Sequence, residues 1–147
     1  MESLVSRPLK STDYNNGVVE LLAQLTVIDK KGVTEERFVQ WCKMLQNNPL
    51  HQIQVVLDQK SRVIGIATLL IEPKLIHNFG FVGHIEDVVV HNDHRNRGIG
   101  KFLIDSLSKY GKEAGCYKVI LDCSESNVPF YEKCGFKKHG VEMSLYF

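Results

Sequence analysis

Seven consecutive residues at positions 95–101, RNRGIGK, have the side chains and backbone best suited to binding an anion. Glycine lets the backbone approach a ligand closely because no Cβ intervenes, and the first amides of a helix favour negative charge. Arg95, Arg97 and Lys101 add three cations beside Gly98 and Gly100. The combination predicts a site for a multiply charged phosphate group. The alternative is a flexible strand-to-helix turn whose arginines are solvated.

Two common phosphate-binding motifs do not match this stretch. A Walker loop needs a glycine at the position of Arg95 and a serine or threonine after Lys101, where Phe102 stands. The dinucleotide fingerprint needs three glycines, and only Gly98 and Gly100 are present. The pattern that does fit is Arg-x-x-Gly-x-Gly.

The residues on either side predict the elements that position this loop. The β-branched run at 84–90 indicates a buried strand. After the loop, apolar and small residues recur at helical spacing, which predicts a helix: Ile99, Phe102, Leu103, Ser106, Leu107 and Tyr110. The loop therefore joins the end of a strand to the start of a helix.

Acidic residues in and beside the strands are the next candidates for chemistry. Glu86 and Asp87 are adjacent, so on a regular strand their side chains face opposite sides of the sheet. Carboxylates among valines are costly unless they are paired or functional, and a buried ion pair is the alternative interpretation. Asp122, at the end of a later strand, is a third acid. His91 and His94 lack further ligands at suitable spacing, so we expect a solvated turn and no metal site.

Composition indicates one ordinary globular domain over residues 1–147. The chain is 44% hydrophobic and 24% charged with a net charge of +1, so nothing suggests a nucleic-acid or membrane surface. The cysteines lack the spacing of a zinc site or disulfide framework and indicate a reducing compartment: Cys42, Cys116, Cys123 and Cys134. No signal peptide or spanning stretch is recognised, so we expect a cytoplasmic protein, with an organelle reached by an unrecognised signal left open.

The order of apolar patterns and turn residues predicts a mixed α/β fold. We expect an edge strand at 5–9, where Pro8 fits, a helix at 18–26, and a second helix between its cap Thr34 and Asn47. A hairpin of strands at 53–57 and 63–71 follows, then an irregular segment at 74–80. Beyond the central strand and the helix after the loop, we expect a strand at 117–121, a short helix at 127–133 and a last strand at 141–146.

The loop, together with the Phe-Tyr-x-x-x-Gly-Phe sequence at 130–136, resembles the GCN5-related N-acetyltransferases (GNAT). Segments at 74–77 (KLIH), 83–88 (GHIEDV), 115–118 (GCYK) and 121–123 (LDC) are similar to one branch of that family, the glucosamine 6-phosphate N-acetyltransferases. The resemblance implies the GNAT fold, a mixed central sheet flanked by helices. It also implies a homodimer whose active sites draw on both chains, with acetyl-CoA as co-substrate and no metal.

The resemblance also implies roles for individual residues. Tyr131 would protonate the leaving thiolate, although packing in the core is the alternative for its ring. Glu86 acting through a water, or the Asp122 backbone carbonyl, would assist the amine. The expected cofactor-binding residues are Val88, Val89, Val90, Arg95, Asn96, Arg97, Gly98, Ile99, Gly100, Lys101, Asn127 and Tyr131. The expected substrate-binding residues are Thr26, Lys74, His77, Glu86, Asp87 and Asp122.

One departure from the family concerns the sugar phosphate. The family's basic residue near the C-terminus is missing, because this chain ends Glu142-Met-Ser-Leu-Tyr-Phe147; Lys74 or His77 would have to replace it. We therefore expect acetylation of the amine of D-glucosamine 6-phosphate, on the route to UDP-N-acetylglucosamine. The alternatives are N-acetylation of a protein lysine or another small amine, and a non-catalytic acyl-CoA-binding module.

Overall fold

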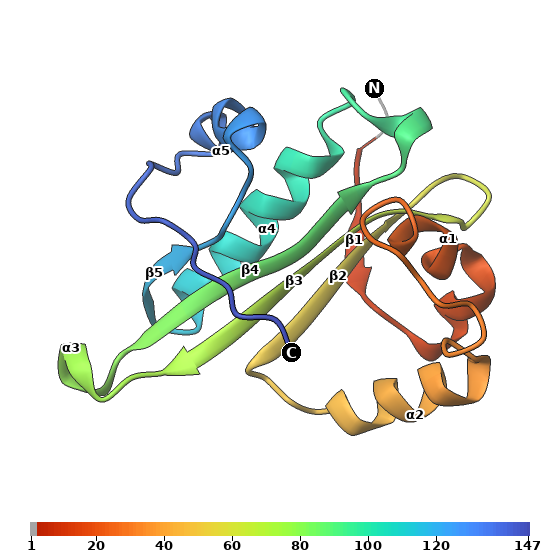
Figure 1. The fold of residues 1–147 in the computed structure, drawn as a ribbon, viewed down its shortest axis with the longest axis horizontal. Coiled ribbons are helices and arrows are strands. Elements are labelled where there is room, and N and C mark those ends of the chain that lie inside the picture. The colour runs from red at the N-terminus through yellow and green to blue at the C-terminus, as the bar shows by residue number, and fades with distance from the viewer. Residues whose placement is uncertain (1–2) are drawn as a thin grey trace.

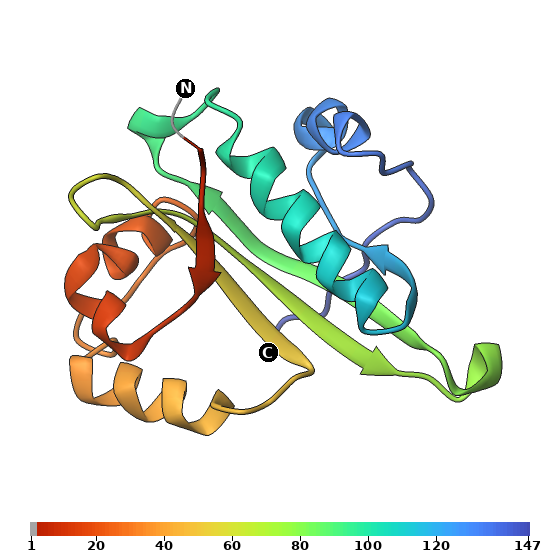
Figure 2. The ribbon, with the colours of Figure 1, turned by 180° about the vertical axis from the view of Figure 1, so that it is seen from behind.

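A five-stranded sheet organises residues 3–147, the part of the chain that the computed structural model describes (Figures 1 and 2). Its order is β1-β2-β3-β4-β5, with the first four strands antiparallel and β5 parallel to β4. The strands are β1 (Ser6–Pro8), β2 (His51–Leu57), β3 (Val63–Pro73), β4 (Phe81–Val90) and β5 (Cys116–Ile120). The predicted edge strand, hairpin and central strand are confirmed, and Pro8 lies on the sheet edge as expected.

Helices cover the two faces of this sheet. The long helix α4 (Ile99–Glu113) packs on one face, and α1 (Val18–Leu22), the 3₁₀ turn η1 (Ser11–Asn16) and α2 (Glu35–Leu45) lie on the other side. The short helix α5 (Val128–Lys133) follows η3 (Glu125–Asn127) beyond β5, and η2 (Asn92–His94) follows β4. A single turn, α3 (Ile76–Phe79), forms the tip between β3 and β4. None of the helices in the described residues is long and apolar enough to cross a membrane.

Helix α4 packs closely because its apolar stripe matches the sheet beneath it. Leu103, Ile104 and Leu107 are almost completely buried, and burial of each such side chain is worth about 1.5–3 kcal/mol. A Cβ at Gly65 of β3 would lie 2.8 Å from Ile99 Cγ2, so only glycine permits this separation between strand and helix. The packing fixes where the first turn of α4 lies relative to the sheet.

The second predicted helix forms as α2, one residue after its cap. The Thr34 hydroxyl oxygen accepts a hydrogen bond from the Arg37 amide at 3.3 Å, which satisfies one of the unpaired donors of the first turn. Glu35 and Glu36 in that turn suit the positive end of the helix dipole. The cap and the charges together explain why the helix begins here.

The predicted last strand at 141–146 is wrong. Residues 137–147, which we call the C-terminal segment, form no strand and cross the sheet face away from α4 as an extended chain (Figure 1). Their apolar side chains are largely exposed, with Leu145 at 79% and Tyr146 at 91% of full accessibility. An alternating sequence becomes a strand only where a neighbouring edge offers hydrogen bonds, and none is paired with this segment here.

Candidate functional site

The loop between β4 and α4 exposes backbone amides at the start of the helix. Asn96 (φ 61°) and Gly98 (φ 79°) both adopt left-handed backbone conformations. Gly98 is the N-cap of α4, and no side chain caps the first turn, so its amides keep hydrogen-bonding capacity for a ligand. The residues predicted to bind an anion therefore include the first residues of α4, Gly98, Ile99, Gly100 and Lys101, which lie together at one helix end.

The three cations beside these amides differ in whether they already have a partner within the chain. Arg95 Nε donates a hydrogen bond to the Val90 carbonyl at 3.2 Å, which ties the loop to the end of β4. Lys101 Nζ pairs with Asp105 at 2.6 Å, and this contact raises the pKa of Lys101. Arg97 is exposed and takes part in no ion pair within residues 3–147. The loop thus offers positive charge to a ligand from two anchored cations and one unpaired cation.

Strands β4 and β5 separate beside this loop. Their pairing ends at His84 with Ile120, whereas β4 continues to Val90. The His91 amide donates to the Ile64 carbonyl of β3, so by alternation the Val90 amide points into the gap. By the same alternation Val89 faces β3. Val88 lies where the register between β3 and β4 shifts, so alternation gives no direction for its amide. Of the three valines predicted to present amides to an acyl group, Val90 is the one that this register directs into the gap.

A β-bulge in β4 changes the expected arrangement of the acids. Between the pairs Glu86–Thr68 and Val89–Ile66, two residues of β4 oppose one residue of β3, and Asp87 adopts φ 53°. The bulge interrupts strict alternation at this point. The prediction that Glu86 and Asp87 face opposite sides of the sheet depended on that alternation. The bulge turns the end of β4 as it approaches the loop.

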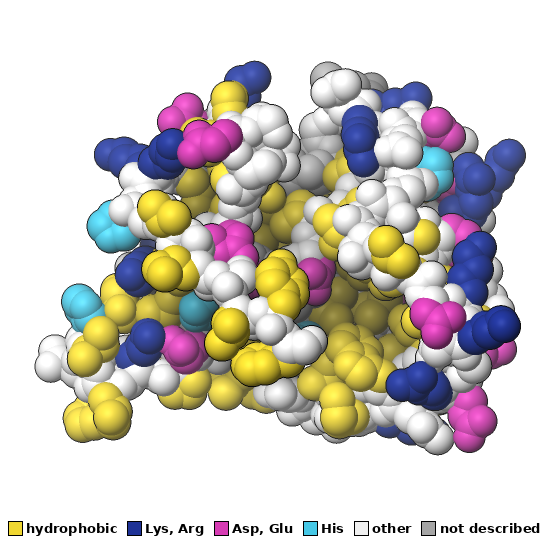
Figure 3. All heavy atoms as spheres, viewed as in Figure 1, with side chains coloured by type: hydrophobic (Ala, Val, Ile, Leu, Met, Phe, Trp, Pro, Cys, Tyr) yellow, Lys and Arg dark blue, Asp and Glu magenta, His cyan; other side chains and the backbone are white. Residues whose placement is uncertain are grey.

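The carboxylates influence one another across the gap. Loss of solvation raises the pKa of Glu86, and the charges of Asp122, Asp87 and Glu142 raise it further. Asp122 follows the end of β5, so β4, β5 and the C-terminal segment all contribute acid to this region. Figure 3 shows acidic side chains near the middle of the hollow on this face. A carboxylate with a raised pKa is better matched to proton transfer near neutral pH than a free one.

Tyr131 and Asp122 line one cavity, as predicted. It has a volume of about 560 Å³ and lies between the end of β5, α5 and the C-terminal segment. Burial raises the pKa of Tyr131, and the neighbouring Cys123 and Cys134 raise it further, so its hydroxyl keeps its proton at neutral pH. The ring lies edge-on to Phe130, with centroids 4.9 Å apart. Tyr131 therefore has the packing contact of its alternative role, and its hydroxyl keeps the proton that the predicted donor role requires.

Other predicted residues lie apart from this cavity. Lys74 pairs with Glu72 at 2.6 Å, and His77 stacks on Tyr117 of β5 with centroids 4.0 Å apart. Lys74 lies just before α3 and His77 lies within it, at the tip between β3 and β4. Glu86 lies five residues beyond the start of β4, about 17 Å along the strand from that tip. One chain alone does not bring Lys74 and His77 to the acids.

Thr26 lies nearer to the loop. It is exposed just after α1, and Gln24, two residues before it, accepts a hydrogen bond from the Asn92 amide at 2.9 Å. Asn127, the residue before α5, is also exposed. His91 Nδ1 accepts a hydrogen bond from the Asp93 amide, and residues 3–147 contain no group of three or more potential metal ligands.

Two contributors were not predicted from the sequence. Phe130 lies against the loop, since a Cβ at Gly100 would be 3.1 Å from Phe130 Cζ. Glu142 lines the cavity with Asp122. Neither is signalled by local spacing, because both contacts depend on how segments distant in sequence meet.

Comparison with known proteins gives consistent matches. The model of the acetyltransferase (GNAT) family matches residues 18–136. The chain is 42% identical over 142 residues to glucosamine 6-phosphate N-acetyltransferase 1 of Dictyostelium discoideum, covering 95% of this chain and 88% of that protein. It is 42% identical over 138 residues to the Candida albicans glucosamine 6-phosphate N-acetyltransferase, with 93% and 91% coverage. The crystal structure of the Arabidopsis thaliana enzyme of that name superposes with a TM-score of 0.94 at 40% identity, covering 99% of each chain.

Proposed function

The chain belongs to the acetyltransferase (GNAT) family, and we propose that it transfers the acetyl group of acetyl-CoA to the amine of D-glucosamine 6-phosphate. The products are N-acetyl-D-glucosamine 6-phosphate and CoA, and the first of these lies on the route to UDP-N-acetylglucosamine. The observation that carries the proposal is the 42% identity to an enzyme of this name over 95% of the chain. The loop and cavity described above supply matching chemistry.

The loop at 95–101 is suited to the pyrophosphate of acetyl-CoA. Uncapped amides at the start of α4 and the exposed Arg97 both favour a multiply charged anion. The Val90 amide faces the gap between β4 and β5, where a thioester carbonyl oxygen would accept its hydrogen bond. In this proposal the reacting carbonyl lies toward the cavity that Tyr131 and Asp122 line, on the β5 side of the gap.

Acyl transfer then needs two proton movements. The sugar amine attacks the thioester carbonyl carbon, a C–N bond forms, and the C–S bond breaks. The attacking nitrogen loses a proton. Either Glu86 accepts this proton through a water, or the Asp122 backbone carbonyl helps to position it. The departing thiolate gains a proton from Tyr131. Transfer is direct, in a ternary complex, without an acetylated enzyme. The raised pKa values of Glu86 and Tyr131 suit an acceptor and a donor.

The substrate phosphate needs cations from outside the CoA loop, and we assign Lys74 and His77 to it. Because these residues lie far from Glu86 in one chain, they serve the site of a second copy in a homodimer. Part of the sheet face away from α4 is left open by the helices, and Leu70 and Ile120 of β3 and β5 are 43% and 38% exposed, which supports association. The exposed apolar residues of the C-terminal segment lie over the same face (Figures 1 and 3).

The dimer is tested by sedimentation velocity on the full chain and a Leu145→Asp variant. We expect a dimer for the parent and dissociation of the variant at micromolar concentration, because a charge replaces an apolar contact. Lys60→Asp, in the exposed turn between β2 and β3, is the control and should remain dimeric. A monomeric parent chain would refute the shared site.

The substrate is tested by release of free CoA thiol over a panel of amines. We expect turnover with glucosamine 6-phosphate, much weaker turnover with glucosamine, and none with lysine peptides. A lysine amine titrates near pH ~10.4, and loss of its proton at neutral pH demands a stronger base than a sugar amine does. Lys74→Ala should raise KM for the phosphorylated sugar alone. Equal activity on the two sugars, or faster acetylation of a peptide, would overturn the substrate assignment.

A further inference from the structure

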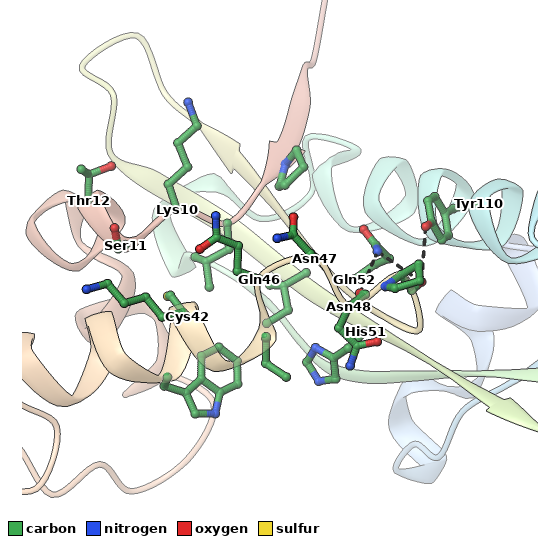
Figure 4. Close-up of a pocket in the computed structure, with 17 residues that line it drawn as sticks. Lys10, Ser11, Thr12, Cys42, Gln46, Asn47, Asn48, His51, Gln52 and Tyr110 are labelled. Carbon is green, nitrogen blue, oxygen red and sulfur yellow. Dashed lines mark hydrogen bonds between the residues drawn. The ribbon is translucent and has the colours of Figure 1, made fainter.

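A second cavity lies at the opposite edge of the sheet from the CoA loop. It has a volume of about 690 Å³, within the range of roughly 300–1,000 Å³ common for small-molecule sites. It exists because β1 ends at Pro8, which leaves the first residues of β2 without a neighbouring strand between η1 and the end of α2 (Figure 4). None of the residues assigned above to acetyl-CoA or the sugar phosphate lines it.

The charges around this cavity are all positive. Lys10 and Lys43 line it from two different elements, and neither takes part in an ion pair within the described chain. No aspartate or glutamate is among the lining residues. The charge of Asp13 contributes, after burial, to raising the pKa of Cys42 in the lining. Asp13 is itself fully buried, however, and paired with Arg7 at 2.7 Å. The cavity therefore favours an anion.

Flat and amide side chains make up much of the remaining wall. Trp41 is 40% exposed, although its ring also meets His51 edge-on with centroids 6.1 Å apart. Figure 4 shows Gln46 and Asn47, from the end of α2, in the middle of the group of lining residues, with Gln52 beyond them. An exposed indole offers a stacking surface to any planar ring, and a carboxamide pairs one donor and one acceptor, as a nucleobase edge does.

We propose that this cavity binds a nucleoside phosphate, with the base against Trp41 and the amides and the phosphate between Lys10 and Lys43. Lysine binds phosphate as a point charge, and two lysines from different elements match a dianionic group. The site is separate from that for acetyl-CoA. Its existence does not depend on which amine the enzyme acetylates.

Trp41 provides a direct readout because it is the only tryptophan in the chain. The experiment titrates the full-length protein, with its CoA site filled, with UDP and with ADP, following tryptophan fluorescence. Inorganic pyrophosphate is titrated as a competitor of the bound nucleotide. We expect saturable quenching by at least one nucleotide and much weaker binding of pyrophosphate. CoA at a concentration just sufficient to fill its own site blocks that site, so a nucleotide that quenches occupies another one. A larger excess is avoided because CoA itself carries a nucleoside phosphate.

Variants locate the ligand. Lys10→Gln/Lys43→Gln should weaken nucleotide binding by roughly tenfold or more, because contacts of phosphate with charged groups are lost. Lys60→Gln/Lys112→Gln removes the same charge outside the cavity and should bind like the parent. Both double variants change exposed side chains, and circular dichroism checks their folding.

Three outcomes would overturn the proposal. One is the absence of saturable quenching by either nucleotide up to millimolar concentration. Another is equal weakening in the two double variants. The third is pyrophosphate binding as tight as nucleotide binding, which would leave an anion site without a base. Turnover of amino sugars is not part of the readout, so failure here is distinct from failure of the proposed activity.

Discussion

Replacing Tyr131 with phenylalanine separates catalysis from packing. The variant keeps the ring contacts with Phe130 and Phe136, at centroid distances of 4.9 and 6.2 Å, and removes only the hydroxyl. That hydroxyl makes no hydrogen bond with another residue in 3–147, so the free energy of unfolding should change by less than about 1 kcal/mol. If Tyr131 protonates the leaving thiolate, the rate of the chemical step should fall by roughly 10²–10⁴-fold, or about 2.7–5.4 kcal/mol.

The assay is single-turnover acetyl transfer measured by rapid quench, with CoA affinity and urea unfolding measured on the same samples. Tyr14→Phe is the matched control, because the Tyr14 hydroxyl donates to the Val33 carbonyl at 3.1 Å, far from the cavity. That variant should lose about 1 kcal/mol of stability and no activity. A Tyr131→Phe enzyme with the parent rate constant would refute the donor role. Equal losses of rate in both variants would attribute the effect to packing.

Three further changes test other parts of the structure. Asp122→Asn removes a negative neighbour that raises the pKa of Glu86, so the acidic limb of the kcat/KM profile should move to lower pH; an unmoved limb would argue against Glu86 as the base. Gly98→Ala forces a Cβ onto a backbone with φ 79° and should raise the Kd for CoA with little change in folding, as calorimetry would check. Asp13→Ala leaves the Arg7 charge without its partner and should lower the free energy of unfolding by about 3 kcal/mol at pH 7, measured by urea unfolding. Because Arg7 holds the pKa of Asp13 below its ordinary value despite burial, this cost should be present above pH ~3.9 and vanish as pH falls through the folded-state pKa.

The parts of the fold that depend on local sequence were predictable. Gly98 and Gly100, with the helical spacing of apolar residues from Ile99 to Leu107, predict a loop followed by a helix. The structure has both the loop and the helix. Tyr131 and Asp122 lie in one cavity, as the resemblance implied. These predictions succeed because turn chemistry and helical periodicity are encoded within a few residues.

The parts that depend on distant neighbours were not predictable. Asp87 adopts a left-handed backbone because of its pairing with β3, and nothing in its own sequence demands a bulge. The C-terminal segment alternates like a strand, but alternation alone supplies no partner edge, so no strand forms. Lys74 and His77 precede Glu86 closely in sequence, yet the length of β4 carries them to the opposite end of the sheet.

The central claim is that an amide bond forms between the acetyl group of acetyl-CoA and the nitrogen of glucosamine 6-phosphate. NMR of a reaction with [1-¹³C]acetyl-CoA and ¹⁵N-labelled glucosamine 6-phosphate observes that bond directly. We predict a ¹³C carbonyl resonance coupled to ¹⁵N, at a rate that depends on Tyr131, with the phosphorus resonance still that of a phosphate monoester. Hydrolysis to free acetate without a carbon–nitrogen coupling, or no consumption of acetyl-CoA, would contradict the account.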